Sequence, residues 1–321
     1  MVLLAAGIEL PVAAQMSGPV LGYVLDRAIG SVRPITGVPG SALAAPPLGL
    51  PSRLRAMAVS PTQDFAVALS ADRRRVLMID LRTAIVKQLL GEDALPDRIA
   101  ISRNGKAVAL DYARAGDVRV LTGLPDAIAA IDIDVSLLAG PPDVLVAADD
   151  GTLLMSTASA ESSRLYRLSP GATPVLLASG GKIAAAAFLG TSGDVVFADQ
   201  ATNTVARVKP TGTVSVLASV ADAIASPSAI AATADGSRVF VANSGARSVA
   251  ILDANGGLLD AVDCPCSPVA LEPLSGNATF RLTDLAASPI WVLDGEGLRP
   301  RVVFVPVPPV LSDATAVRDF R

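Results

Sequence analysis

Residues 234–253 read ADGSRVFVANSGARSVAILD, and this stretch decides the fold. The turn ADGS is followed by the apolar run Val239–Asn243 and, after a short polar turn, by a second apolar run, Val249–Asp253. Short runs rich in Val, Ile and Phe that are bounded by Gly, Ser, Asn and Asp are typical of β-strands joined by tight turns. The stretch therefore predicts two consecutive strands of one sheet.

The same pair of runs recurs along the chain. The first run of each pair ends in a small or polar residue, and these runs are Phe65–Ser70, Ala107–Asp111, Val144–Asp149, Val195–Asp199, Val239–Asn243 and Thr279–Asp284. The turns before them contain Gln63, Gly105, Pro142, Gly193, Gly236 and Gly276, which are spaced by 42, 37, 51, 43 and 40 residues. A period of this length predicts the four-stranded blades of a β-propeller.

Each pair is flanked by a further apolar run on either side, so that six complete four-stranded units lie between Arg53 and Val307. The N-terminal runs Leu21–Asp26 and Ser31–Ile35 add only the third and fourth strands of a seventh unit. We therefore expect an all-β fold with a single propeller domain over residues 18–307, seven blades being favoured and six possible. The unit of 51 residues contains the stretch Gly151–Ser163, which is interpreted as an irregular loop insertion.

Composition limits the function classes. The chain has 321 residues, of which 51% are hydrophobic, 17% charged and only 3% aromatic, so a close-packed interior of Val, Ala, Leu and Ile is expected. The net charge is −4 and no basic stripe is present, so no nucleic-acid partner is predicted. The sequence contains no histidine, which excludes Ser-His-Asp and Cys-His catalysis and imidazole-ligated metals.

The two ends of the sequence lie outside the repeats. Residues 1–15 read MVLLAAGIELPVAAQ and end in small residues before Gln15, as signal peptides do. Because Glu9 interrupts the apolar run and no basic residue precedes it, we interpret the segment as a truncated signal peptide, an apolar tail being the alternative. We therefore expect an extracytoplasmic protein, periplasmic or secreted. Residues 308–321 are expected to form a C-terminal tail, and no segment has the length of a transmembrane helix.

The unit 234–253 resembles the YVTN-type repeat of lactonase-like propellers, in which a pattern of the form dG-rvyVaNsgsntVsviD spans the second and third strands. The other units match this pattern less closely and have Ser or Asp where this unit has Asn243. The resemblance implies a propeller fold and an extracytoplasmic tendency, but no particular activity. Lactonases of related fold rely on His, Glu and Arg, and this chain has no His.

Cys264 and Cys266 are the only cysteines, and they lie in a loop between two predicted blades. In an oxidising compartment a local disulfide between them is expected. Free buried thiols and a redox or metal function are the alternatives. Two thiolates alone do not complete a tetrahedral metal site, so no metal site is predicted here.

Polar residues recur at the ends of the predicted second strands. If the units align, Asp111, Asp149, Asp199, Asn243 and Asp284 form a ring at one level of the propeller. Oxygen ligands in such a ring suit Ca²⁺. Repetition in successive units is also what a local role predicts, because Asp and Asn side chains bond to the turns that follow them. The local role is the favoured interpretation, and no cofactor is predicted apart from Ca²⁺ as this alternative.

A second candidate is the turn that contains Arg73, Arg74 and Arg75, since guanidinium groups suit carboxylates and phosphates. A solvated turn is the alternative. From all these features we expect a monomeric, non-enzymatic propeller that binds a protein or glycan partner. A lactonase-like hydrolase that uses Asp and Arg residues at the channel, and a structural platform of the cell envelope, are the other hypotheses.

Overall fold

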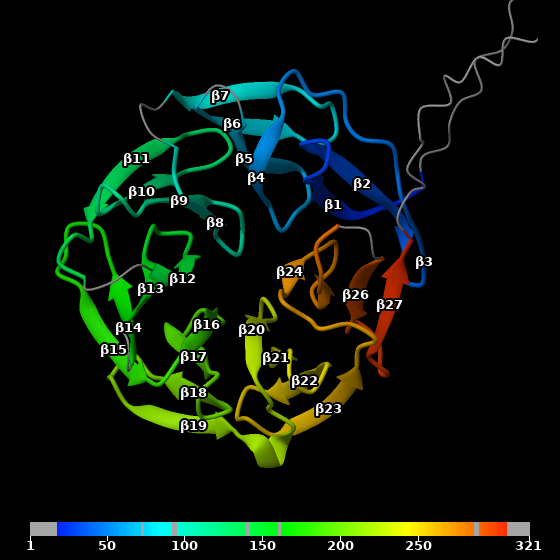
Figure 1. Cartoon of the computed structure of the whole chain (residues 1–321). Coiled ribbons are helices and arrows are strands. Elements are labelled where there is room, and N and C mark those ends of the chain that lie inside the picture. The colour runs from blue at the N-terminus through cyan, green and yellow to red at the C-terminus, as the bar shows by residue number, and fades with distance from the viewer. Residues whose placement is uncertain are drawn as a thin grey trace, which may run out of the picture.

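Seven antiparallel sheets follow one another along the chain and stand as blades around a central channel (Figure 1). The computed structural model describes residues 18–71, 74–91, 95–138, 142–159, 162–285 and 289–306. Six blades have four strands and the first has three. The all-β fold and the favoured number of seven blades are thereby confirmed.

The blades are consecutive in sequence. Blades 1 to 3 contain β1 (Val20–Asp26), β2 (Ser31–Val38) and β3 (Ser41–Ala44); β4 (Leu54–Val59), β5 (Phe65–Ser70), β6 (Arg75–Asp80) and β7 (Val86–Gly91); and β8 (Arg98–Ile101), β9 (Ala107–Tyr112), β10 (Asp117–Thr122) and β11 (Ala129–Asp134). Blades 4 and 5 contain β12 (Pro142–Ala147), β13 (Leu153–Ala158), β14 (Ser163–Leu168) and β15 (Val175–Gly180); and β16 (Ile183–Leu189), β17 (Asp194–Asp199), β18 (Thr204–Val208) and β19 (Val214–Ala218). Blades 6 and 7 contain β20 (Pro227–Ala232), β21 (Arg238–Asn243), β22 (Ser248–Asp253) and β23 (Leu258–Asp263); and β24 (Glu272–Pro273), β25 (Thr279–Arg281), β26 (Ile290–Asp294) and β27 (Arg301–Val305). A single 3₁₀ turn, η1 (Val220–Asp222), precedes blade 6 within the described residues.

The strand order gives the propeller two different faces. In each four-stranded blade the first strand lies at the channel and the fourth at the rim (Figure 1). Because neighbouring strands are antiparallel, the turns after the first and third strands lie on one face, which we call the turn face. The turns after the second strands and the loops between blades lie on the opposite face, which we call the loop face.

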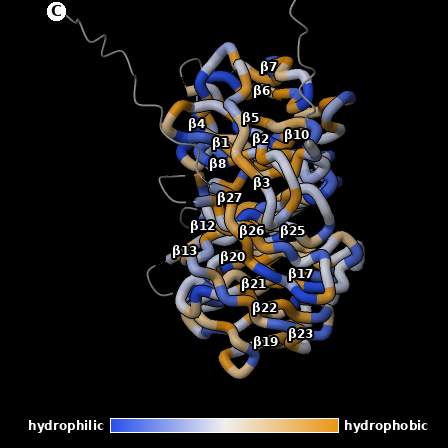
Figure 2. The backbone as a smooth tube through the Cα atoms, turned by 90° about the vertical axis from the view of Figure 1, so that its right-hand side faces the viewer, coloured by the Kyte–Doolittle hydropathy of each residue, from blue (hydrophilic) through white to orange (hydrophobic). Residues whose placement is uncertain are grey.

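The core lies between the blades. Buried apolar side chains of the described residues form seven clusters, and each cluster joins the facing sheets of two adjacent blades. Between blades 2 and 3, for example, Val67 and Leu69 pack with Val108 and Leu110. In Figure 2 the strands are mostly hydrophobic and many connecting turns are hydrophilic. Small aliphatic side chains fit this arrangement because sheets that pack face to face lie only about 10 Å apart.

The first blade is more complete than the sequence predicts. The backbone N–H of Ser275, in a turn-face turn of blade 7, donates to the Leu21 carbonyl at 2.8 Å, so β1 begins at the turn face as second strands do. Strand β3, which the sequence does not predict, lies at the rim beside β27 (Figure 1). The N-terminal segment therefore supplies the second, third and fourth strands of its blade, and the prediction of a third and fourth strand alone is wrong.

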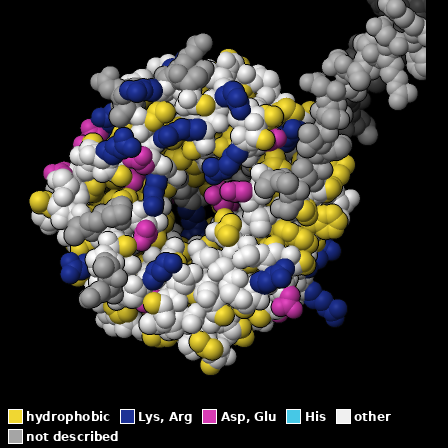
Figure 3. Space-filling view, in the orientation of Figure 1, with side chains coloured by type: hydrophobic (Ala, Val, Ile, Leu, Met, Phe, Trp, Pro, Cys, Tyr) yellow, Lys and Arg dark blue, Asp and Glu magenta, His cyan; other side chains and the backbone are white. Residues whose placement is uncertain are grey.

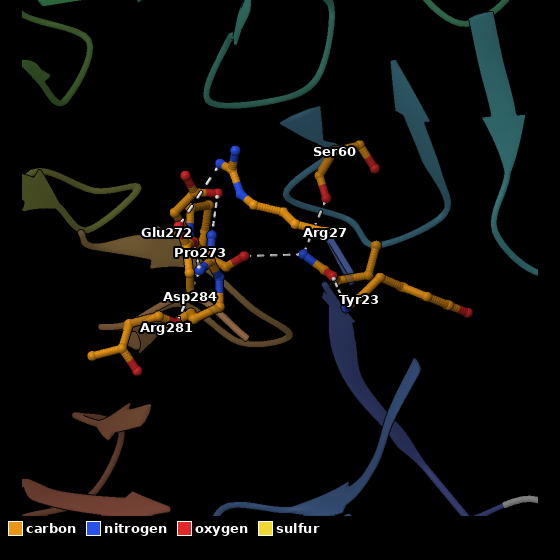
Figure 4. A network of polar contacts seen from close by, with 9 residues as sticks. Tyr23, Arg27, Ser60, Glu272, Pro273, Arg281 and Asp284 are labelled. Atoms are coloured by element: carbon orange, nitrogen blue, oxygen red, sulfur yellow. Dashed lines mark hydrogen bonds and ion pairs between the residues drawn. The ribbon is translucent and has the colours of Figure 1, made fainter. Parts of the chain in front are cut away.

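Side chains from both neighbouring blades fill the place of the missing innermost strand. The buried Gln63 of blade 2 accepts a hydrogen bond from the Tyr23 N–H at 3.2 Å and donates to the Pro273 carbonyl of blade 7 at 3.1 Å. Gln63 also donates to the Ser60 carbonyl at 3.1 Å, and Figure 4 labels its three partners, Tyr23, Ser60 and Pro273. The Leu274 side chain lies 2.5 Å from where a Cβ on Gly22 would be, so a larger residue at this position would require Leu274 to shift. The ring is thus closed by side chains where a strand is absent.

The register of blade 4 differs from the prediction. The run that the sequence assigns to a second strand is the first strand, β12, and the stretch interpreted as an insertion contains the true second strand, β13. The equivalent turn position is then Gly151, and the spacings become 42, 46, 42, 43 and 40 residues. All six positions have a left-handed backbone, with φ of 57° at Gln63, 71° at Gly105, 85° at Gly151, 76° at Gly193, 71° at Gly236 and 113° at Gly276.

The predicted signal peptide (residues 1–15) and the predicted C-terminal tail (residues 308–321) lie outside the described residues. Within the described part of the chain, no helix has the length and hydrophobicity that crossing a membrane would require.

Candidate functional site

The central channel is a cavity of about 490 Å³ bounded by the innermost strands of blades 2 to 7. Most of the side chains that line it are aliphatic or aromatic, and they come from β4, β8, β12, β16, β20 and the segment around β24. The opening is visible at the centre of the space-filling view (Figure 3). Among the described residues of the lining, only Arg103 and Glu272 carry charged side chains.

Arg103 crosses the channel at the turn face. It lies in the turn between β8 and β9 of blade 3, and its Nη2 donates to the Ala232 carbonyl of blade 6 at 2.7 Å. Burial lowers the pKa of this guanidinium, while the carboxylates of Asp235 and Asp149 act in the opposite direction. Figure 3 shows dark blue, the colour of Lys and Arg, inside the opening. One end of the channel is therefore spanned by a positive charge.

An ion-pair network lies at the loop-face mouth of the channel (Figure 4). Arg281 pairs with Asp284 and, at 3.4 Å, with Glu272, and Arg27 of blade 1 lies 3.8 Å from Asp284. Burial opposes the charge on Arg281, but the two carboxylates outweigh it and raise the pKa of the guanidinium. The network links blades 1 and 7 beside the incomplete blade.

A larger collection of arginines lies on the loop face of blades 1 to 3. Two adjoining hollows, of about 520 and 600 Å³, share Arg55 in their linings. We call the surface formed by these hollows the arginine surface; its basic residues are Arg27, Arg53, Arg55, Arg74 and Arg114. Figure 3 shows dark-blue side chains gathered over blades 2 and 3 and around the opening. Among the described lining residues, Asp97 is the single acid.

Two of these arginines donate hydrogen bonds to uncharged backbone carbonyls. Arg53 donates to the carbonyls of Ala28 and Ile29, both at 3.1 Å, and Arg55 donates to the carbonyl of Pro96. Carbonyl oxygens orient a guanidinium without neutralising it. The arginine surface is therefore a preformed region of positive charge on a chain whose net charge is −4.

The structure extends the predicted anion-binding turn. Arg73 lies outside the described residues, Arg74 lines the second hollow, and Arg75 turns its Nη2 toward Ser52 Oγ at 3.4 Å. Sequence reasoning missed Arg27 and Arg114, which occupy the same turn after the second strand in blades 1 and 3. An alignment of the units on their second and third strands would have shown an arginine in the turn between them in three successive blades.

The predicted ring of second-strand ends is not formed as expected. Asp149 follows the first strand of blade 4, and it accepts hydrogen bonds at 2.6 Å from both Ser102 Oγ and Asn104 Nδ2 of the neighbouring turn. It therefore lies on the turn face, at the opposite end of the sheet from Asp111 and Asp199. The prediction that Asp149 belongs to the ring is wrong, because the run that the sequence assigns to a second strand is the first strand of this blade.

Asp199 and Asn243 bind the loop that leads into their own blade. Asp199 accepts hydrogen bonds from the backbone N–H groups of Gly181, Lys182 and Ala201 at 2.9–3.0 Å. Burial opposes its ionisation, yet these donors lower the pKa of the carboxyl. Asn243 accepts from the Ala225 N–H and donates to the Ala223 carbonyl, both at 3.0 Å. Only the contact with Ala201 is to the turn that follows the strand, as the sequence favours; the other contacts are to the loop before the first strand of the same blade.

The predicted equivalence of Asp111 is also wrong by one residue, because Tyr112 occupies the position of Asp199 and Asn243 at the end of the second strand. Asp111 is fully buried, and neither of its carboxylate oxygens has a hydrogen-bond partner among the described residues. Burial raises its pKa, Arg98 opposes the shift and Asp97 adds to it. Asp284 is half exposed and pairs with Arg281. The described residues contain no group of three or more His, Cys, Asp or Glu side chains placed to hold a metal ion.

Cys264 and Cys266 are joined by a disulfide in the loop between β23 and β24. Both are buried and pack in the cluster that contains Phe240 and Phe280. Arg247 donates to the Cys266 carbonyl at 3.2 Å. The disulfide thus anchors the loop that connects blades 6 and 7.

Comparison with known proteins gives the fold and no more. No family model matches the sequence, and no curated protein matches it. A streptogramin B lyase structure is similar over 81% of this chain and 86% of its own, with a TM-score of 0.58 and 15% identity. A functionally unknown protein from Desulfotomaculum acetoxidans is similar over 89% of this chain and 100% of its own, with a TM-score of 0.56 and 12% identity. A chain from a nidogen/laminin complex is similar over 76% of this chain and 92% of its own, with a TM-score of 0.52 and 16% identity.

Proposed function

We propose that the chain is a non-enzymatic, extracytoplasmic binding propeller whose loop face binds an anionic partner. The partner that fits best is an acidic region of another protein. The observation that carries the proposal is the arginine surface: five arginines line two adjoining hollows that contain one described acid. Guanidinium groups form paired hydrogen bonds with carboxylates, and Arg is enriched in protein interfaces.

The geometry favours binding without large rearrangement. Arg53 and Arg55 are oriented by backbone carbonyls of the propeller itself, so little conformational freedom is lost when a partner arrives. Arg27, Arg74 and Arg114 extend from equivalent turns of a rigid ring. A surface of one sign also steers an oppositely charged partner toward it.

Two further features support the extracytoplasmic location. The Cys264–Cys266 disulfide suits an oxidising compartment. The unit 234–253 resembles the YVTN-type repeat, which has an extracytoplasmic tendency. The structural neighbours include both a lyase and a nidogen/laminin complex, so their names favour neither catalysis nor binding for this chain.

The alternative of a hydrolase has one observation in its favour. Glu272, Asp284 and two arginines converge at the channel mouth, as an Asp- and Arg-based site would require. Both carboxylates, however, already pair with Arg281. A carboxylate held in an ion pair is a weak proton acceptor, so the network is better suited to joining blades 1 and 7 than to general base catalysis.

The test is a binding measurement on the whole chain with poly-glutamate, dextran sulfate and neutral dextran as probes. We expect poly-glutamate to bind with an affinity that falls as salt rises. The triple variant Arg27→Met, Arg74→Met and Arg114→Met should bind it about tenfold more weakly or worse.

A matched variant removes three exposed positive charges from the turn face: Arg82→Met, Lys106→Met and Lys209→Met. It should bind poly-glutamate like the unmodified chain. Equal losses in the two triple variants would show that net charge alone drives binding and would refute the proposal. Binding of dextran sulfate without binding of poly-glutamate would replace the acidic protein with an anionic glycan.

A further inference from the structure

The channel has the properties of a small-molecule pocket, separate from the arginine surface. Its volume of about 490 Å³ lies in the range of ligand pockets, which are mostly apolar and contain a few polar groups that fix the ligand's orientation. Its walls include Ile99, Leu145, Phe188 and Ile230 from four different blades. An apolar ligand would remove this surface from water.

One charged group stands at the turn-face end of this pocket. Arg103 spans the channel from blade 3 to the Ala232 carbonyl of blade 6, a contact between residues 129 positions apart. A guanidinium has five N–H donors, and this bond uses one of them. The remaining donors have no hydrogen-bond or ion-pair partner among the described residues.

The two acids whose charges act on Arg103 make their hydrogen bonds elsewhere. Asp149 accepts hydrogen bonds from Ser102 and Asn104, and Asp235 accepts them from Thr233 and Ser237. The hydrogen bonds from Thr233 and Ser237 lower the pKa of Asp235 to about 2, so this carboxylate stays ionised but is directed to its own turn. Both acids act on Arg103 from a distance, and neither lies within 4.0 Å of its guanidinium as an ion-pair partner among the described residues. A positive charge at the base of an apolar pocket is stabilised best by a bound anion.

We propose that the channel binds a small apolar monocarboxylate, with the carboxylate on Arg103 and the apolar body against the innermost strands. This activity goes beyond partner binding on the loop face and does not depend on it. A single guanidinium matches a single carboxylate, whereas a doubly charged phosphate would leave charge uncompensated among apolar walls.

Two kinds of molecule combine a single carboxylate with an apolar body. One is an alkanoate, whose body is a plain hydrocarbon chain. The other is the C-terminus of a short apolar peptide, whose amide groups could pair with the unpaired edges of the innermost strands. Decanoate represents the first kind, and N-acetyl-Val-Leu with a free carboxylate represents the second.

The experiment is isothermal titration calorimetry on the whole chain with these two probes, and with decyltrimethylammonium and N-acetyl-Val-Leu-amide as matched controls without the carboxylate. At least one carboxylate should bind, and its control should bind at least tenfold more weakly. If decanoate is the better probe, shortening it by one methylene should weaken binding about fourfold.

Three variants test the role of Arg103. Arg103→Met should weaken binding of the carboxylate about 10- to 100-fold, since a hydrogen bond to a charged group is lost. Arg103→Glu should reverse the preference toward decyltrimethylammonium. Arg167→Met is the matched control, because Arg167 also donates to a backbone carbonyl of the next blade, that of Gly193 at 2.7 Å, but lies outside the channel lining.

The outcomes are decisive in both directions. Loss of binding in Arg103→Met with retention in Arg167→Met, at unchanged thermal stability, supports the proposal. The proposal is overturned if neither carboxylate binds the unmodified chain, if the controls bind equally well, or if Arg103→Met binds like the unmodified chain. Binding to the arginine surface is measured separately with poly-glutamate, so failure of one proposal leaves the other intact.

Discussion

Blades 5 and 6 and blades 1 to 3 use the same repeat in different ways. In blades 5 and 6 the polar residue at the end of the second strand, Asp199 or Asn243, makes three or two hydrogen bonds to nearby backbone groups. In blade 3 the equivalent position is Tyr112, and Asp111, one residue before it, is buried without a hydrogen-bond partner among the described residues. Blade 1 lacks its innermost strand, and the arginine surface lies over blades 1 to 3.

The difference indicates that the repeat stabilises the fold in blades 5 and 6 and contributes less to stability in blades 1 to 3. A buried polar group is stabilising only when its hydrogen bonds are made, and it is costly when they are not. Blades 5 and 6 meet this condition, so the regular part of the ring is expected to be the more stable part. Unsatisfied groups and collected charge in blades 1 to 3 are typical of a surface retained for binding.

The largest expected effect comes from placing a carboxylate at the end of the second strand of blade 6, where the surrounding groups fit an amide. Asn243→Asp places a carboxylate at a fully buried position and removes the donor to the Ala223 carbonyl. We expect the free energy of unfolding at pH 7 to fall by about 3 kcal/mol. Urea denaturation measures the change. Asn255→Asp, at an exposed turn of the same blade, is the control, and an equal loss there would refute this explanation.

The next effect concerns the closure of blade 1. Gln63→Ala removes the contacts that join Tyr23 of blade 1 and Pro273 of blade 7, and we expect a loss of about 2 kcal/mol. Amide hydrogen exchange at Tyr23 should accelerate, because its N–H loses its buried acceptor. Gln88→Ala, on the exposed outer strand of the same blade, should leave this exchange rate unchanged. Unchanged protection of Tyr23 in Gln63→Ala would contradict the role given to Gln63.

The disulfide lies between the regular and the irregular parts of the ring. Because it closes a very short loop, its removal in Cys264→Ala/Cys266→Ala should lower the free energy of unfolding by about 1.5 kcal/mol. A reducing agent should have a similar effect on the unmodified chain and none on the double variant. Equal sensitivity of both proteins to the reductant would rule out a contribution from this bond.

The smallest effect comes from removing the buried carboxyl of blade 3. The pKa of Asp111 is raised by burial, so its folded state favours the protonated carboxyl. Such a group stabilises the fold only below its unfolded pKa of about 3.9, and this contribution is lost as the pH rises toward the folded pKa. Asp111→Asn should therefore raise the free energy of unfolding by about 1 kcal/mol at pH 7.

This gain should disappear near pH 3.5, where the buried carboxyl of the unmodified chain is neutral. Thermal unfolding of both proteins at pH 7 and pH 3.5 measures it. Destabilisation by Asp111→Asn at pH 7 would mean that the ionised carboxylate has a favourable role, and the contrast between the two parts of the ring would then be one of function only.

The sequence alone determined the features that depend on neighbouring residues. Turn residues and apolar runs predict the strands, their period predicts the blades, and the spacing of Cys264 and Cys266 brings them together. Blade 4 was misread because the runs Val144–Ala147 and Leu153–Thr157 are both short and apolar, and a local pattern does not tell a first strand from a buried second strand.

Only the tertiary structure decided what the ring brings together. Arg103 meets Ala232 across 129 positions and Gln63 meets Pro273 across 210, and no local pattern marks either pair. The arginine surface likewise collects residues from positions 27 to 114, which lie on three successive blades. The tendency to form a strand depends on residues that are neighbours in sequence. A binding surface depends on which distant turns the closed ring brings side by side. The fold could therefore be predicted from the repeat, whereas the candidate sites, apart from the turn that contains Arg74, could be found only once the ring was closed.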